Sequence, residues 1–189
     1  MKLKTVLIGP PNSGKSCIFN RLKYGDFYEN VQPSTQPAYF KKEYEDKNIG
    51  TFFIEYWDTA GQERYRAISP LFFQDAQLSI VVFDINDENS YTQAKDWVLQ
   101  IKEQIEDSSI FLVGNKIDLL DETCLRFNDI AEYSRSIGAM FFQTSAKTGE
   151  GLQLMFNTLV DFLLSHYLDN GIQQENQGIN VPDSKKKCC

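Results

Sequence analysis

The stretch KLKTVLIGPPNSGKS, residues 2–16, runs from a short apolar segment into a glycine-rich loop. Residues 3–8 are typical of a buried strand, and residues 16–24 are typical of a helix. Between them, Gly9, Gly14, Lys15 and Ser16 complete the pattern G-x-x-x-x-G-K-S. This pattern between a strand and a helix predicts a phosphate-binding loop and, with it, a P-loop NTPase fold.

The chemistry of this loop is local. Consecutive backbone N–H groups and a helix N-terminus both favour an anion, so we expect them to surround phosphate oxygens. Lys15 adds a full charge between the β- and γ-phosphates, and the Ser16 hydroxyl reaches Mg²⁺. Pro10 and Pro11 lack N–H groups, but they stand at the entrance of the loop, so we expect it to function. The predicted phosphate-contacting residues are Asn12, Ser13, Gly14, Lys15, Ser16 and Cys17.

The rest of the chain alternates between strand-like and helix-like segments, which predicts a three-layer α/β/α domain with a mostly parallel sheet. Residues 1–168 are expected to form one globular domain. The polar remainder, residues 169–189, is expected to be a flexible tail. Residues 26–37 are expected to be a loop, and the periodicity of 60–76 is weak. The further predicted strands are 52–58, 78–84, 109–115 and 140–145, and the further predicted helices are 91–105 and 152–167.

Composition narrows the function classes. The net charge of −7 argues against a nucleic-acid partner, because a phosphate backbone selects for Lys and Arg. No apolar stretch of the sequence is long enough to cross a bilayer. The four cysteines, at 17, 124, 188 and 189, suit neither a zinc site nor a disulfide framework, so we expect a reducing, cytoplasmic location.

The tetrapeptide NKID, residues 115–118, follows a predicted buried strand, where ligands of open α/β sheets bind. A carboxylate can accept two hydrogen bonds from the N1–H and N2–H₂ edge of guanine, and adenine offers no such pair of donors. Asp118 is therefore the predicted guanine reader. We expect Asn115 to tie neighbouring loops together and the stem of Lys116 to cover the base.

Residues 145–147, with the sequence SAK, follow the next predicted strand. The Ala146 amide is expected to meet guanine O6, with Lys147 packed nearby and Ser145 completing the base site. GPPNSGKS, DTAGQE (58–63), NKID and SAK, in this order and spacing, resemble a small GTPase of the Ras superfamily over residues 3–168. The segments WDTAGQERYRAIS (57–69), LFFQDA (71–76) and VVFDIN (81–86) are similar to the Rab family.

This resemblance implies a six-stranded sheet with one antiparallel edge strand, five helices and slow hydrolysis of GTP to GDP. Asp58 is expected to hold Mg²⁺ through water, and Thr35 is expected to ligate Mg²⁺ and contact the γ-phosphate. The Gly61 amide is expected to contact the γ-phosphate, and Gln62 to orient the attacking water. A partner protein is expected to supply the arginine that accelerates hydrolysis. Tyr28, or Phe27 if the spacing differs by one residue, is expected to lie over the base edge.

Residues 30–40 and 60–73 are expected to switch with the γ-phosphate. The resemblance implies that Phe40, Trp57 and Phe72 face effectors, and the alternative is that all three belong to the core. Two departures from relatives stand out: Pro11, close to where a partner's arginine enters, and Gln36-Pro37 after the switch threonine. We expect them to alter hydrolysis and partner choice rather than nucleotide binding.

Cys188 and Cys189, behind the lysines at 185–187, resemble a double prenylation site. The alternative is an unmodified tail with a solubilising charge run. The implied partners are exchange factors, activating proteins, escort proteins and effectors, and the implied location is the cytosolic face of intracellular membranes in vesicle traffic, with the chain as a monomer.

Two other functions compete with this one. The first is a GTP-binding module with weak or no hydrolysis, acting as a membrane-tethered scaffold. The second is an ATP-using kinase, which NKID argues against.

Overall fold

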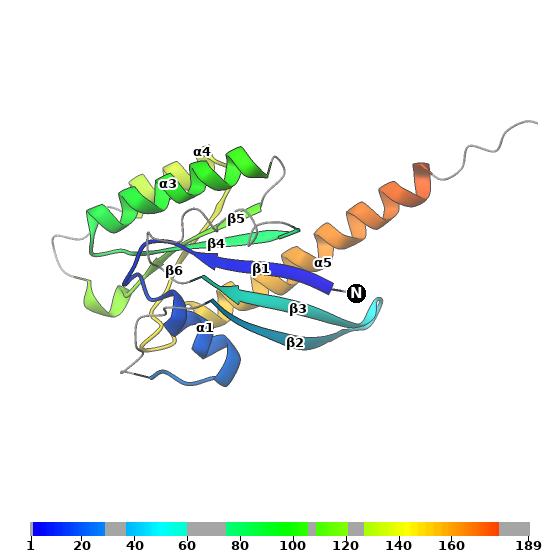
Figure 1. Ribbon diagram of the computed structural model, residues 1–189, viewed down its shortest axis with the longest axis horizontal. Coiled ribbons are helices and arrows are strands. Elements are labelled where there is room, and N and C mark those ends of the chain that lie inside the picture. The colour runs from blue at the N-terminus through cyan, green and yellow to red at the C-terminus, as the bar shows by residue number, and fades with distance from the viewer. Residues whose placement is uncertain (1, 29–36, 60–74, 106–108, 121–126, 178–189) are drawn as a thin grey trace, which may run out of the picture.

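The computed structural model describes residues 2–28, 37–59, 75–105, 109–120 and 127–177. Figure 1 shows one sheet between two layers of helices. The strands are β1 (Lys2–Ile8), β2 (Ala38–Asp46), β3 (Gly50–Asp58), β4 (Leu78–Asp84), β5 (Ser109–Asn115) and β6 (Met140–Gln143). The helices are α1 (Lys15–Tyr24), α3 (Glu88–Gln104), α4 (Phe127–Ser136) and α5 (Leu152–Gln177), and η2 (Ile117–Leu119) is a single 3₁₀ turn.

The sheet has six strands in the order β2-β3-β1-β4-β5-β6. All neighbouring pairs are parallel except β2 and β3, which pair antiparallel at one edge. This arrangement confirms the expected six-stranded, mostly parallel sheet. The central strands β4 and β5 are buried almost throughout, as expected for a sheet covered on both faces.

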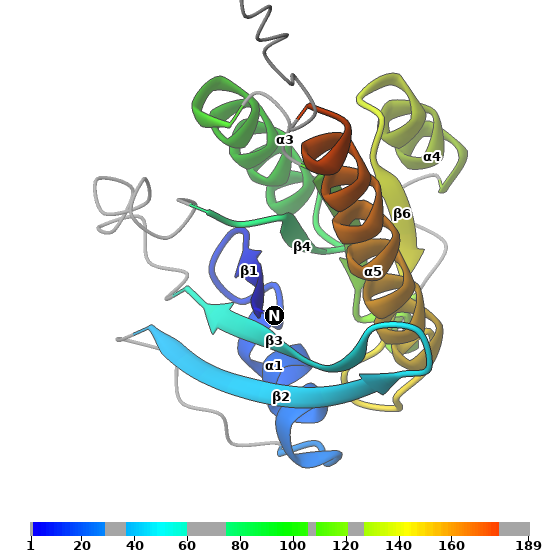
Figure 2. The ribbon, with the colours of Figure 1, turned by 90° about the vertical axis from the view of Figure 1, so that its right-hand side faces the viewer.

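Two hydrophobic clusters lie on the two faces of the sheet. Helices α1 and α5 pack on one face, around Phe19, Met155 and Leu159. Helices α3 and α4 pack on the other face, around Val98 and Ile130, and Figure 2 shows α5 and α3 on either side of the strands. The three-layer architecture is therefore confirmed. The family resemblance implies five helices, and four α-helices lie within the described ranges.

The observed element ends differ from the predicted ones where local interactions act. Helix α3 begins at Glu88, three residues earlier than expected, because the Asp87 side chain caps it by accepting from the Asn89 N–H at 2.9 Å. Strand β6 ends at Gln143 rather than at 145, because Thr144 and its successors turn into a loop. Helix α5 continues to Gln177, ten residues beyond the predicted end and into the segment expected to be a flexible tail.

The sequence patterns did not predict two of the observed elements, β2 and α4. Strand β2 carries five charged residues in nine, and it is an exposed edge strand held by its pairing with β3. Helix α4 buries only Ile130 and Ser134, so its apolar pattern is short. In the described part of the chain, no helix is long and apolar enough to cross a membrane.

Candidate nucleotide-binding site

The loop between β1 and α1 is shaped by glycines at positive φ. Gly9 and Gly14 have φ of +139° and +91°, values that side-chain-bearing residues rarely adopt. A Cβ at Gly14 would collide with the Asn115 amide, and a Cβ at Gly9 would collide with the carbonyl of Val82. The pattern of glycines in the sequence therefore reflects close packing as well as backbone conformation.

The two prolines are accommodated at the start of this loop. Pro11 is exposed, and the carbonyl of Pro10 accepts a hydrogen bond of 2.6 Å from Lys15 Nζ. Although Pro10 has no N–H to offer a phosphate, its carbonyl holds the lysine side chain across the loop.

Lys15 lies inside the loop with only 4 % of its surface exposed. Its Nζ also donates to Ser13 Oγ at 3.4 Å. Burial lowers the pKa of the Lys15 ammonium to about 8, and the nearby Asp58 carboxylate partly opposes this effect. An anion close to Nζ would restore the charged form, so a polyphosphate fits this position.

The oxygen atoms suited to Mg²⁺ come from two elements. Asp58 ends β3 and is 1 % exposed, and Ser16 lies half-buried in the first turn of α1. Mg²⁺ prefers one or two protein oxygens together with waters and phosphates, rather than an all-protein cage. The described residues likewise contain no cluster of three or more acidic, His or Cys side chains that could bind a metal by themselves. This donor set fits a Mg²⁺ shared with a nucleotide.

Asn115 joins the phosphate loop to the second predicted binding region. Its Nδ2 donates to the Ser13 carbonyl at 2.9 Å, and its Oδ1 accepts from the Ala146 N–H at 3.0 Å. Thr144 Oγ1 donates to the same Oδ1 at 3.3 Å, and the Asn115 side chain is almost completely buried. One amide therefore connects loops that are more than a hundred residues apart in sequence.

Lys116 has a left-handed backbone conformation, with φ of +69°. Its Nζ pairs with Asp84 Oδ2 at 2.7 Å, and Asn86 Nδ2 donates to its carbonyl at 3.0 Å. Sequence reasoning did not assign a role to Asp84 or Asn86. Asp84 ends the buried parallel strand β4 and Asn86 follows it, at the same edge as NKID, and that position was the available signal.

Asp118 and the 145–147 loop are brought together as predicted. Ser145 Oγ donates to Asp118 Oδ1 at 2.6 Å and accepts from the Thr148 N–H at 3.0 Å. Ala146 is buried, whereas Asp118 and Lys147 are exposed. A hydrogen bond from Ser145 orients the Asp118 carboxylate, which is the group predicted to read guanine.

Tyr28 and Phe27 are both described, and they have different surroundings. Tyr28 is 50 % exposed and meets Tyr24 edge-on, with ring centroids 6.2 Å apart. Phe27 is half-buried and packs against the hydrophobic cluster under α1 and α5. The placement of Tyr28 over the base edge, or of Phe27 with a shift of one residue, stays a prediction.

Phe40 and Trp57, two of the predicted effector aromatics, lie on opposite faces of the β2–β3 pair. Phe40 meets Phe19 of α1 with ring centroids 4.9 Å apart. Trp57 instead lies beside Tyr39 at 4.7 Å, and Lys4 Nζ is 5.3 Å from its ring. Tyr39, 44 % exposed and directly opposite Trp57 in the register, was missed as a surface aromatic.

Of the other predicted residues, Asn12 is exposed at the phosphate loop with φ of +60°, and Cys17 is half-buried in α1. The rest fall outside the described ranges. These are Thr35, Gly61, Gln62, Phe72, Cys188 and Cys189, together with the Gln36 departure.

Comparison with known proteins agrees with this geometry. The family model described as "Ras family" matches residues 4–165. Rab-21 of Geodia cydonium is 36 % identical over 87 % of this chain and 72 % of the relative. Rab-17 of Mus musculus is 32 % identical over 98 % of this chain and 90 % of its own length. The GTP-binding protein YPT53 of Saccharomyces cerevisiae is 36 % identical over 84 % of this chain and 75 % of its own length.

The family match covers all of the sheet except the first two residues of β1, and every described residue of the predicted site. The named relatives are Rab or YPT proteins matched over most of their length. The chain therefore belongs to the Ras family, as a Rab-type small GTPase.

Proposed function

We propose that this GTPase holds GDP or GTP with Mg²⁺ along the carboxyl edge of the sheet, and that hydrolysis of GTP switches its binding to effectors in vesicle traffic. The observation that carries the proposal is the Asn115 side chain, which bonds to both the Ser13 carbonyl and the Ala146 N–H. This connection puts a phosphate-binding loop and a base-binding loop at a fixed separation, as a nucleotide requires.

At the phosphate end, the loop amides of residues 12–17 bind phosphate oxygens, and Lys15 compensates the negative charge. Ser16 and Thr35, with Asp58 through a water, would hold Mg²⁺, which when bound would neutralise charge on the phosphates. Gly61 donates its N–H to the γ-phosphate, and Gln62 orients the water. Since positioning supplies most of the catalysis, hydrolysis by the isolated chain is slow, on the order of 10⁻⁴ to 10⁻² s⁻¹.

At the base end, Asp118 accepts from the N1–H and N2–H₂ groups of guanine, and the Ala146 N–H donates to O6. Lys116 covers one face of the base, and Ser145 and Lys147 complete the pocket. A nucleotide without the two adjacent donors leaves the Asp118 carboxylate without its partners, and this penalty supplies the discrimination.

The partners follow from this cycle. Exchange factors and activating proteins set the nucleotide state, effectors bind the switch residues with Phe40, Trp57 and Phe72, and an escort protein carries the lipidated form. Cys188 and Cys189 carry prenyl groups that anchor a monomer to the cytosolic face of intracellular membranes. Pro11 and Gln36-Pro37 alter the choice of activator and effector.

The test is a single-turnover assay on protein loaded with GTP. We expect slow phosphate release from the wild-type chain, further slowed in Gln62→Leu, and acceleration by an activating protein that supplies an arginine. Stable GTP binding without phosphate release under any of these conditions would instead indicate a binding module, which the relatives do not favour.

A further inference from the structure

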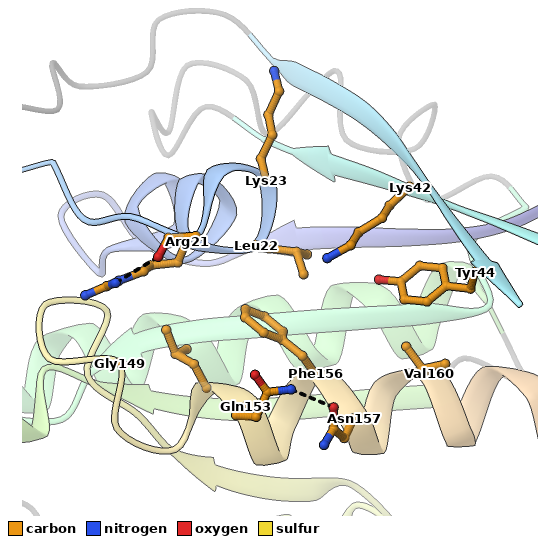
Figure 3. Close-up of a pocket in the computed structure, with 12 residues that line it drawn as sticks. Arg21, Leu22, Lys23, Lys42, Tyr44, Gly149, Gln153, Phe156, Asn157 and Val160 are labelled. Atoms are coloured by element: carbon orange, nitrogen blue, oxygen red, sulfur yellow. Dashed lines mark hydrogen bonds between the residues drawn. The ribbon is translucent and has the colours of Figure 1, made fainter.

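Arg21 lies outside the predicted site, in the last turn of α1, and its guanidinium reaches both the distant loop at 146–147 and Gly25, the residue that ends its own helix. Nε donates to the Ala146 carbonyl at 2.9 Å, and Nη2 donates to the Lys147 carbonyl at 2.6 Å. Nη1 donates to the Gly25 carbonyl at 3.0 Å, a bond drawn as a dashed line in Figure 3.

The guanidinium of Arg21 lies at the end of a cavity that is next to these loops. The residue lines a cavity of about 450 Å³ between α1, β2 and α5, together with Leu22 and Phe156. Figure 3 shows the guanidinium turned away from Phe156 and toward the loops. On the loop side it also lies 6.0 Å from the ring centroid of Phe27. One side chain therefore joins the 145–147 loop to residues 25–27.

Both of these segments are predicted to touch the base. The Ala146 N–H, which in this structure donates to Asn115 Oδ1, is the predicted donor to guanine O6, and Phe27 or Tyr28 is predicted to cover the base edge. Ala146 is held on its N–H side by Asn115 and on its carbonyl side by Arg21. A planar guanidinium can donate to several carbonyls at once, which the ammonium of a lysine cannot match in a fixed geometry.

We propose that Arg21 is a positioning residue that bridges the 145–147 loop and the 25–28 segment, and thereby sets the rate at which guanine nucleotide is released. The inference rests on the proposed function of Ala146 at the base. Displacement of residues 25–28 breaks the hydrogen bond from Arg21 to the Gly25 carbonyl. Arg21 is then held only by its bonds to the carbonyls of Ala146 and Lys147. Release of the base is thus coupled to movement of the segment that leads into the first switch.

The test uses the full chain loaded with a fluorescent N-methylanthraniloyl GDP and chased with excess GDP. We expect Arg21→Ala to release nucleotide about tenfold faster, because charge-assisted bonds to two loop carbonyls are lost. Arg21→Lys should fall in between. The matched control is Lys23→Ala, which removes a cation two residues along the same helix, with its ammonium near the rings of Tyr24 and Phe40, and should release at the wild-type rate.

A second measurement separates positioning from general destabilisation. 6-Thioguanosine diphosphate keeps both donors that Asp118 is proposed to read, the N1–H and the 2-amino group, but presents sulfur in place of O6, which is a weaker acceptor for the Ala146 N–H. If Arg21 acts through the loop, Arg21→Ala weakens GDP binding about tenfold and weakens binding of this analogue clearly less.

The outcomes are distinct. Equal weakening of both nucleotides overturns the proposal and assigns Arg21 a structural role only. Release from Arg21→Ala at the wild-type rate also overturns it while leaving the GTPase function intact. If the wild-type chain holds no GDP in the presence of Mg²⁺, then the proposed function itself fails.

Discussion

A single buried lysine has a protonation state that depends on what occupies its loop. Burial lowers the pKa of Lys15 from 10.5 to about 8, so above pH 8 the nucleotide-free protein holds mainly the neutral amine. Bound phosphates favour the ammonium instead. Binding must therefore take up a proton from solvent in this pH range, and the affinity for GDP should fall as the pH rises.

We expect close to one proton to be taken up per GDP bound at pH 9, and up to a tenfold loss of affinity per pH unit between pH 8 and pH 10. Calorimetry in two buffers of different ionisation enthalpy measures the uptake. The variant Lys15→Met should bind more weakly and show no such uptake. An identical uptake in this variant would assign the proton to another group.

Asn115 offers a second test at the residue scale. Asn115→Ala leaves the Ser13 carbonyl and the Ala146 N–H without their shared partner inside the protein. Two lost bonds at about 1–3 kcal/mol each predict GDP release that is accelerated by about a hundredfold or more. Asn157→Ala, the same change on the exposed side of α5, is the control and should not alter release. Comparable release from both variants would argue against the joining role of Asn115.

At the scale of elements, strand β2 is joined to its neighbour β3 through a pair of tyrosines. The hydroxyl groups of Tyr44 and Tyr56 lie 2.8 Å apart, and Tyr56 is fully buried. The ring of Tyr44 also stacks on Phe52 with centroids 5.5 Å apart. A strand rich in charged residues is therefore held by a hydrogen bond and ring packing beneath it.

Removal of one hydroxyl of this pair should lower the free energy of unfolding more than removal of both hydroxyls. Tyr44→Phe strands the buried Tyr56 hydroxyl, so we expect a loss of about 1–2 kcal/mol in the free energy of unfolding. The double variant Tyr44→Phe/Tyr56→Phe should recover part of that loss, because no buried donor is left unpaired. Urea unfolding of the GDP-bound proteins measures both, and strictly additive losses would contradict this account.

At the scale of the whole molecule, parallel strands assemble the site. Strands β1, β3, β4 and β5 direct their carboxyl ends to one edge, which brings together the loop after Ile8, Asp58, Asp84 and the segment from Asn115. Residues from the first and middle thirds of the chain meet there. All described site residues precede 148, so the end of the chain can serve another purpose.

Deletion of residues 178–189 should therefore leave GDP release unchanged and abolish membrane attachment. Two prenyl chains give stable anchoring where one gives only marginal binding, so Cys188→Ser alone should reduce binding of prenylated protein to anionic vesicles strongly. Vesicle flotation measures the bound fraction. Equal flotation of the prenylated wild-type chain and Cys188→Ser would show that the second chain is not needed.

The amino-acid sequence by itself determined the strand–loop–helix around GPPNSGKS, the buried strands 78–84 and 109–115, and the family. These features depend on neighbouring residues: apolar runs of strand length, and glycines where the backbone needs a positive φ. The residues that we expect to read guanine were also located from the sequence, because strands that are buried and parallel place their following loops at one edge.

Only the tertiary structure decided the contacts between distant segments. The Asp84–Lys116 ion pair, the Arg21 bonds to the 145–147 loop and the opposite facing of Phe40 and Trp57 depend on strand register and on helix placement. The exposed strand β2 is likewise held by its partner β3 rather than by its own pattern. Neighbouring residues in the sequence do not predict such interactions, because the partners that stabilise them lie far away in the chain.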